Sequence, residues 1–289
     1  MQFIDDVNDS YWQGKRVLLR VGFDMGKEFA AMEEFRIKKG LSSITHLLKR
    51  GVSLVLLNHN GRPAGKADSE LSNARVAKKL GEFLQREVPL IPLGSKEAVS
   101  SPLVLLENLR FDPREETGDS SFAHELAQLG DAYVNDAFSN SHRAHTSMTS
   151  LALLLPHFGG LQLRQELEVL GEVLNNPMHP LLLIIGGLKI ETKMKMVKRF
   201  WDKVEGILLG GALANTFLHA KGIAVGKSVI EPSYLGDIKD IPLTDTRLHL
   251  PVDVRAARDF EGKEGLRISG AGKLKDDEII LDIGPDTEI

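Results

Sequence analysis

Residues 133–147 read YVNDAFSNSHRAHTS, a pattern typical of a buried parallel strand that ends in a ligand-binding loop. The apolar run at 132–134 predicts the strand. The polar loop after it carries Arg143 between His142 and His145. Open α/β sheets bind ligands at the carboxyl ends of their strands, and arginine suits an oxygen-rich anion. Taken alone, the stretch is equally compatible with a solvated basic loop.

The composition is that of an ordinary globular protein. The 289 residues are 42% hydrophobic and 26% charged, enough for one large or two medium domains. A net charge of -4 argues against general binding to nucleic acid or to a membrane surface. The chain has no cysteine, which excludes disulfides and thiolate chemistry. No secretory pattern and no apolar run of about 18 residues is found, so we expect a cytoplasmic protein.

Strands and helical patterns alternate through the first half of the chain, which predicts a mostly parallel sheet. The expected strands are residues 15–21, 52–57, 103–106 and 132–134, with the first helix expected from about Phe35. Basic side chains follow the strand ends, namely Arg36, His59, Arg62, Arg110 and Arg143. Because parallel strands point the same way, we expect these groups to converge on one anion site. The alternative is a solvated surface.

The second half repeats a strand, a Gly-Gly pair and a helix. Strands at 181–185 and 206–209 each lead into such a pair, an arrangement that brings backbone amides and a helix N-terminus to phosphate. Lys189 and Lys193 lie one helical turn apart on the same face. The leucine-rich helix at 163–174 is expected either to join two domains or simply to pack. Further strands are expected at 247–254 and 278–283.

Several segments together, in order along the whole chain, resemble the motifs of the phosphoglycerate kinase family. They are NHNGRP at 58–63, LLENLRF at 105–111, NDAF with HRAH at 135–145, GGLK with Lys193 at 186–193, and DIGP at 282–285. The resemblance implies an α/β fold of two doubly wound, Rossmann-like parallel-sheet domains with an interdomain cleft. The implied parts are an N-terminal phosphoglycerate-binding domain at 1–160, a connecting helix or hinge at 161–179, and a C-terminal nucleotide-binding domain at 180–289.

The resemblance also implies a phosphotransferase of glycolysis and gluconeogenesis. Such an enzyme moves phosphoryl between 1,3-bisphosphoglycerate and Mg-ADP, giving 3-phosphoglycerate and ATP. The implied substrate-binding residues are Gly22, Asp24, Arg36, His59, Arg62, Arg110 and Arg143. The implied nucleotide-binding residues are Gly187, Lys189, Lys193, Gly210 and Gly211. Arg36 and Lys193 are implied to be the catalytic cations, which meet when the domains close. Mg²⁺ is expected to arrive with ADP or ATP rather than at a protein metal site, and we expect a monomer with only small-molecule partners.

Two positions in the first strand's loop depart from the family pattern, which has Asp at Gly22 and Asn at Asp24. The lost carboxylate removes an acceptor for a substrate hydroxyl, worth roughly 1.5–3 kcal/mol. Asp24 adds a negative charge near an anionic ligand. We expect phosphoglycerate affinity to be weaker by roughly one to several decades, at about 1.4 kcal/mol per decade.

Other functions remain open at this stage. The sequence ends at residues 286–289 directly after a predicted strand, so we expect an incomplete second domain with a disabled nucleotide site. The alternative to a kinase is therefore a non-catalytic phosphoglycerate- or anion-binding remnant. A dinucleotide-dependent oxidoreductase is disfavoured, because no G-x-G-x-x-G follows the first strand.

Overall fold

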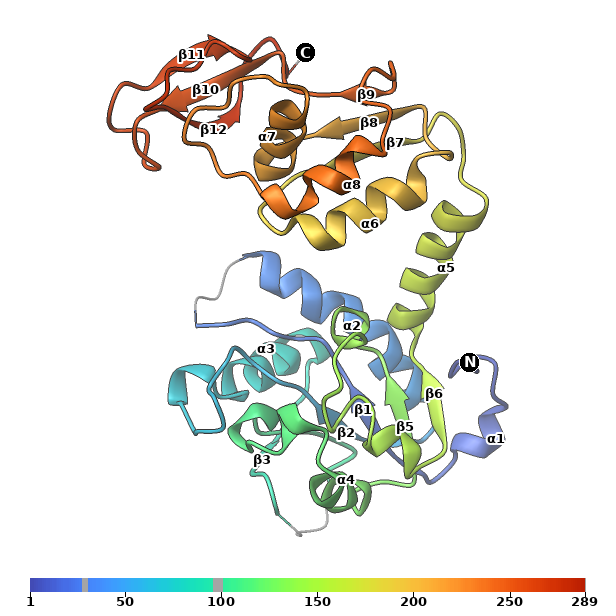
Figure 1. The fold of residues 1–289 in the computed structure, drawn as a ribbon. Coiled ribbons are helices and arrows are strands. Elements are labelled where there is room, and N and C mark those ends of the chain that lie inside the picture. Colours follow the sequence, from blue (N-terminus) through green and yellow to red (C-terminus); the bar gives the residue numbers. More distant parts are fainter. Residues whose placement is uncertain (28–30, 96–100, 289) are drawn as a thin grey trace. The chain divides into compact units, whose positions relative to one another are not determined.

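The computed structural model describes residues 1–27, 31–95 and 101–288, which divide into two compact units, Met1–Leu170 and Gly171–Ile289. Figure 1 shows helices packed against a β-sheet in each unit. The boundary falls inside the helix α5 (Leu161–Asn175), within the segment predicted to connect two domains.

The first unit is built on a sheet with the strand order β3-β4-β2-β1-β5-β6. Its strands are β1 (Arg16–Arg20), β2 (Ser53–Leu57), β3 (Leu90–Ile91), β4 (Leu103–Leu106), β5 (Ala132–Asn135) and β6 (His157–Gly159). Its helices before α5 are α1 (Asp9–Trp12), α2 (Ala31–Lys49), α3 (Ala74–Leu84) and α4 (Ser120–Ala127). Neighbouring strands pair in parallel, which confirms the predicted parallel sheet. The predicted start of α2 at about Phe35 is wrong by four residues, because the prediction rested on Leu41, Ile44, Leu47 and Leu48, which all lie in later turns of the helix.

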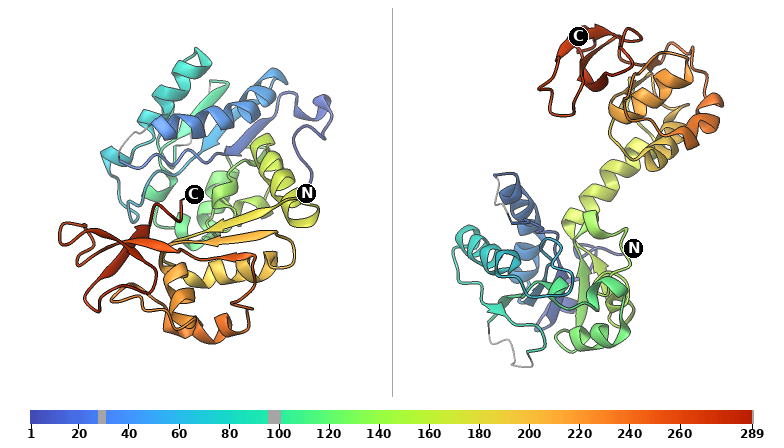
Figure 2. Two further views of the ribbon diagram at one scale, coloured as in Figure 1. Left: turned by 90° about the horizontal axis from the view of Figure 1, so that it is seen from above. Right: turned by 60° about the vertical axis from the view of Figure 1, so that its left-hand side comes forward.

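Alternate residues of each strand point to opposite faces of this sheet, and helices cover both. Val17 and Leu19 of β1 pack in the same core as α2 and α3, whereas Leu18 packs with Phe122 and Leu126 of α4. Figure 2 shows α2 and α3 side by side along the sheet. Burial on both faces explains why the strands are continuous apolar runs.

Asparagine side chains hold the loops at the carboxyl edge of the sheet together. Asn58 Oδ1 accepts a hydrogen bond of 2.9 Å from Phe23 N, and Asn60 Oδ1 accepts one of 2.9 Å from Met25 N. Asn108 Oδ1 in turn accepts a bond of 3.1 Å from Asn60 N. The loops after β1, β2 and β4 therefore form one connected layer.

The second unit contains a parallel sheet, β7-β8-β9, and a separate antiparallel sheet, β11-β10-β12. The strands are β7 (Leu182–Ile185), β8 (Gly206–Leu209), β9 (Leu248–His249), β10 (Asp253–Ala257), β11 (Arg267–Gly270) and β12 (Ile279–Ile283). Its helices are α6 (Ile190–Phe200), α7 (Gly211–Ala220) and α8 (Leu235–Lys239), and short 3-10 turns connect other elements of the chain. The α/β class is confirmed, but the antiparallel sheet was not predicted.

The single strand predicted at 247–254 is wrong. The structure has β9 and β10 in different sheets, and Pro251 lies between them. Proline has no N–H to donate to a strand ladder, which accounts for the break at this position.

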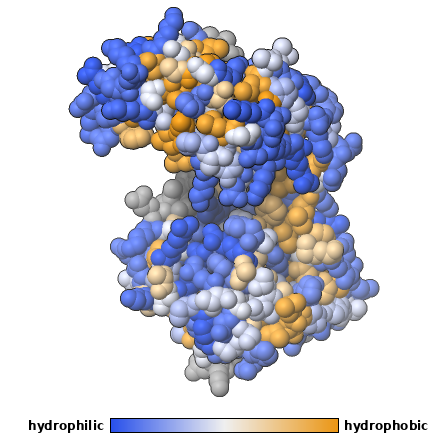
Figure 3. All heavy atoms as spheres, viewed as in Figure 1, coloured by the Kyte–Doolittle hydropathy of each residue, from blue (hydrophilic) through white to orange (hydrophobic). Residues whose placement is uncertain are grey.

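One face of the parallel sheet in the second unit is covered by α6, α7 and α8, whose side chains share a core with Ile185, Ile207 and Leu209. Ile184, on the opposite face of β7, is 76% exposed, whereas Ile185 is 7% exposed. Figure 3 shows apolar residues, in orange, on the surface of this unit. Neighbouring isoleucines thus lie in opposite environments.

This difference predicts opposite costs for the same substitution. Ile185→Thr should lower the free energy of unfolding by about 2–4 kcal/mol, because it removes buried apolar volume and buries a hydroxyl. Ile184→Thr should change it by no more than about 0.5 kcal/mol, as at other exposed sites. Urea unfolding of both variants measures the difference, and equal losses would contradict the assignment of the two faces.

Candidate functional site

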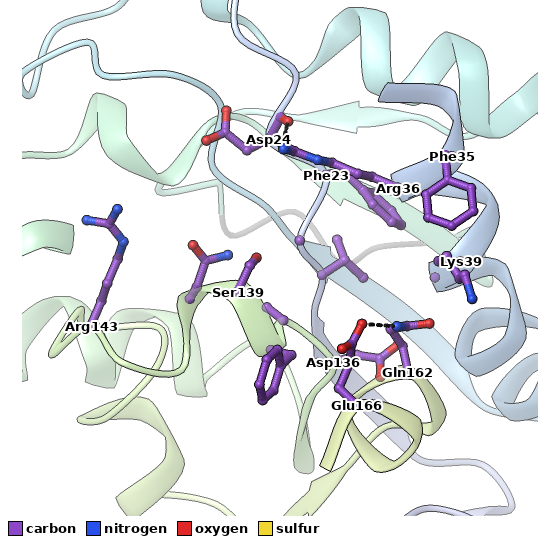
Figure 4. A pocket seen from close by; sticks show the side chains of 16 residues that line it. Phe23, Asp24, Phe35, Arg36, Lys39, Asp136, Ser139, Arg143, Gln162 and Glu166 are labelled. Carbon is purple, nitrogen blue, oxygen red and sulfur yellow. Dashed lines mark hydrogen bonds between the residues drawn. The ribbon is translucent and has the colours of Figure 1, made fainter. Parts of the chain in front are cut away.

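A cavity of about 360 Å³ opens at the carboxyl edge of the first unit's sheet. Figure 4 shows side chains reaching it from the loop after β1, from α2, from the loop after β5 and from α5. Of the predicted substrate-binding residues, those that line it are Gly22, Asp24, Arg36 and Arg143. Lys39, Ser139 and Asn140 also line it and were not predicted.

Three cations, Arg36, Lys39 and Arg143, line the cavity together with three acids, Asp24, Asp136 and Glu166. Arg36 Nη1 donates to the backbone oxygen of Asp24, and Lys39 Nζ lies 5.3 Å from the centre of the Phe35 ring. Arg143 reaches the cavity from a different side (Figure 4). Its Nε is buried and has no hydrogen-bond partner among the residues that the structure describes. An arginine nitrogen in this state can bind an oxygen of a ligand.

The Asp24 carboxylate is held within the protein. Oδ1 accepts a hydrogen bond of 2.8 Å from Gly61 N, and Oδ2 lies 3.5 Å from His59 Nε2. Burial acts to raise the pKa of Asp24, but these two donors outweigh it and hold that pKa well below its usual range. Asp24 therefore remains charged, and the weaker affinity expected from Gly22 and Asp24 stays a prediction.

His59 is buried and does not line the cavity. Burial, with the nearby Arg20 and Arg110, lowers the pKa of His59 to about 4 despite the opposing effect of Asp24. The imidazole is therefore neutral at pH 7. Because Arg20 Nη2 donates to Nδ1 at 2.6 Å, the ring proton lies on Nε2 and points to Asp24. His59 thus positions Asp24 instead of offering a charge to a ligand.

The central member of this network, Arg20, was missed by sequence reasoning. It is fully buried at the end of β1. Its Nε donates to Ser147 Oγ at 2.8 Å, and that hydroxyl donates to Glu115 Oε1 at 2.6 Å. Burial raises the pKa of Glu115, against the lowering effect of Arg20. The sequence did contain a signal for this network, namely an arginine at the end of an apolar strand. A charged side chain buried at such a position must be paired.

The remaining predicted basic residues take different positions. Arg110 is buried, donates from Nη1 to Gly61 O at 2.6 Å, and has Nε 3.0 Å from Glu116 Oε1. The Nη1 bond fixes the loop that also holds Asp24, whereas Nη2 is buried and has no hydrogen-bond partner among the described residues. Arg62 is exposed and does not line the cavity. His145 is buried, and burial with Arg110 lowers its pKa to about 4.

In the second unit the two Gly-Gly pairs lie against each other. Gly187 and Gly211 have φ angles of +112° and +60°, which favour glycine. A Cβ on Gly211 would lie 2.9 Å from Gly187 N. Lys193 Nζ donates to Lys189 O at 3.1 Å and lies beside Gly187. The two loops and Lys193 therefore form one compact group.

A second cavity, of about 350 Å³, adjoins these loops. Gly187 and Gly211 line it together with the polar side chains of Asn215 and Asp282 and with several apolar residues. Gly210 instead lines a separate cavity of about 410 Å³. Lys189 is exposed at the start of α6 and lines neither.

The described ranges contain no group of three or more His, Asp or Glu side chains placed to hold a metal ion. Within the same ranges, no helix has the length and apolar character needed to cross a membrane.

Phosphotransferases bind phosphate with cationic side chains and with glycine-rich loops that lead into helices, and this chain has side chains and loops of both kinds. The profile of the family described as phosphoglycerate kinase matches residues 5–288. A phosphoglycerate kinase of Herpetosiphon aurantiacus is 39% identical over 295 residues, covering 97% of this chain and 75% of the relative. Another from a Roseiflexus species is 37% identical over 296 residues, with the same coverage of 97% and 75%.

Solved structures agree with these sequence matches. The phosphoglycerate kinase of Coxiella burnetii superposes with a TM-score of 0.78 at 32% identity, covering 98% of this chain and 74% of that one. That of Pyrococcus horikoshii has a TM-score of 0.80 at 26% identity, covering 99% and 76%. The chain belongs to the phosphoglycerate kinase family. Its function is that of a glycolytic phosphotransferase, and the alternative of a non-catalytic anion-binding remnant is not favoured.

The state of His59 predicts how stability depends on pH. Its folded-state pKa of about 4 lies below the ordinary value of 6.5, so the unfolded chain takes up a proton first as the pH falls. The free energy of unfolding should therefore fall between pH 7 and pH 5, with His59 contributing about 2 kcal/mol.

Urea unfolding at the two pH values tests this, with His59→Gln beside wild type. The variant should lose that share of the pH dependence, and a matching change at the exposed His157, His157→Gln, should keep it. An unchanged pH dependence in His59→Gln would show that the imidazole is not held neutral.

Proposed function

We propose that the cavity of the first unit binds 3-phosphoglycerate and the acyl phosphate 1,3-bisphosphoglycerate, and that the glycine loops of the second unit bind ADP and ATP. The observation that carries the proposal is a pair of buried donors, Arg143 Nε and Asn140 Nδ2, which have no acceptor among the described residues. Both residues line one cavity with Arg36 and Lys39. Donors left without acceptors beside cationic side chains suit a small, acceptor-rich anion.

In this assignment the charged side chains have different roles in binding the ligand. Arg36, Lys39 and Arg143 contact the phosphate and carboxylate of the ligand. His59 and Arg110 act indirectly, by fixing Asp24 and the Gly61 loop. Arg62, which is exposed beside that loop, contacts the ligand from the edge of the cavity.

The chemistry requires little of the protein beyond position and charge. The leaving group of an acyl phosphate is a carboxylate, so no general base is needed. Phosphoryl transfer depends on cations placed around the equatorial oxygens of the transferring group. Arg36 and Lys193 are our candidates for that neutralisation.

For the nucleotide we propose the second cavity, with Gly187, Gly211 and the start of α7 near its phosphates. Lys189 and Lys193 add positive charge there. Mg²⁺ commonly binds through one or two carboxylates and the phosphates of a nucleotide, and Asp282 is the acidic side chain that lines this cavity. The ion would supply positive charge to those phosphates. We further propose a monomer in the cytoplasm, consistent with the net charge of -4.

The first test is the role of Arg36 in phosphoglycerate binding. Arg36→Ala removes a charge-assisted contact, worth about 1.5–3 kcal/mol, and should weaken affinity by about 10- to 100-fold in calorimetry. Lys38→Ala, on the same helix but outside the cavity, should change affinity by less than about twofold. Equal effects of the two substitutions would show that only the overall charge of the protein affects binding, and would contradict the proposed contact of Arg36 with the ligand.

The second test is the role of Lys193 in the reaction. In a coupled assay with 1,3-bisphosphoglycerate and Mg-ADP, Lys193→Ala should lower kcat by about 100-fold or more, because it removes a cation that stabilises the transition state. Lys195→Ala is the matched control, since Lys195 is exposed on α6 and pairs with Glu191 at 3.1 Å. Wild-type turnover in Lys193→Ala would refute the assignment.

A further inference from the structure

The short turn after β5 places an unpaired amide in the wall of the first cavity. Asn140 ends the 3-10 turn η4 (Phe138–Asn140) and is 6% exposed. Its Nδ2 is buried and has no hydrogen-bond partner in the part of the chain that the structure describes. Asn140 nevertheless lines the cavity. A buried donor without an acceptor is unfavourable, so this amide is placed for a partner that comes from outside the protein.

Ser139, its neighbour, presents a hydroxyl to the same space. Ser139 is exposed and lines the cavity, where Figure 4 shows its side chain on the turn below Asp24. Gly22 faces it, since a Cβ built on Gly22 would lie 3.4 Å from Ser139 Oγ. Gly22 has no side chain of its own, so the hydroxyl and the amide of η4 are the neutral polar groups at this point of the wall.

The charged donors and the neutral donors of the cavity suit different groups of the ligand. Arg36, Lys39 and Arg143 are charged and pair best with the phosphate and the carboxylate of the ligand. A hydroxyl is neutral and needs both a donor and an acceptor, which a carboxamide provides through Nδ2 and Oδ1. We propose that Asn140, assisted by Ser139, binds the hydroxyl of phosphoglycerate and so selects acid phosphates that carry a hydroxyl beside the carboxylate. This inference rests on the proposed function of the cavity.

The test compares two ligands that differ only in that hydroxyl. They are 3-phosphoglycerate and 3-phosphonooxypropanoate, and calorimetry gives the affinity of the full chain for each. Wild type should prefer the hydroxylated ligand by about 10-fold, as expected for one well-made hydrogen-bonded group. Asn140→Ala should abolish most of this preference and keep the affinity for 3-phosphonooxypropanoate within about twofold.

Further variants separate recognition from folding. Ser141→Ala changes the exposed end of the same loop, outside the cavity, and should keep the preference. Ser139→Ala alters only an exposed hydroxyl and should reduce the preference by about threefold, which keeps the inference testable even if Asn140→Ala is unstable. Gly22→Asp in the Asn140→Ala background should restore the preference, because the added side chain has ordinary contact distances and its carboxylate can accept from the hydroxyl.

The outcomes distinguish the inference from the function on which it rests. If neither ligand binds to wild type, both fail. If phosphoglycerate binds but the preference survives Asn140→Ala and Ser139→Ala, only the inference fails. Equal weakening of both ligands by Asn140→Ala would also overturn it, because the amide would then contact an anionic group.

Discussion

The structure of the first unit depends on a buried charge. The Arg20 guanidinium is fully enclosed at the end of β1, and removing such a group from water costs several kcal/mol unless its donors are paired. Its donors reach Val21 O, Leu57 O, Ser147 Oγ and His59 Nδ1. These acceptors lie at the end of β2 or in the loops that follow the three neighbouring strands β1, β2 and β5. Pairing one guanidinium therefore fixes the geometry of the edge where the cavity lies.

This arrangement divides the basic residues into those that build the cavity and those that face it. Arg20, Arg110 and His59 are buried, and their hydrogen bonds are directed at backbone oxygens, at Ser147 Oγ, at Asp24 and at each other. Arg36 and Arg143 line the space that a ligand would occupy. These three buried side chains comprise two permanent charges and a neutral imidazole, so their total charge does not change by titration near pH 7.

The sequence predicts the parallel sheet because burial on both faces leaves a simple signal, continuous apolar runs such as 52–57 and 103–106. It also predicts that loops after those strands meet, since strand direction alone requires it. It does not distinguish Arg143, which lines the cavity, from Arg110, which is buried and does not line it. Side chains beyond a strand end follow no periodic pattern, and their burial is decided by contacts such as Arg110 with Gly61 that are distant in sequence. Asn140 was missed for the same reason.

In the glycine loops of the second unit, the geometry depends on the backbone more than on side chains. The approach of Gly211 to Gly187 N leaves no room for a Cβ, so any side chain there would displace the Gly187 amide. That amide adjoins Lys193, whose ammonium group is tied to Lys189 O. Two glycine pairs that look like separate turns in the sequence thus act as one group, because β7 and β8 are paired in register and end together. Lys193 is positioned by this contact, and a phosphate bound by either loop must lie near its charge.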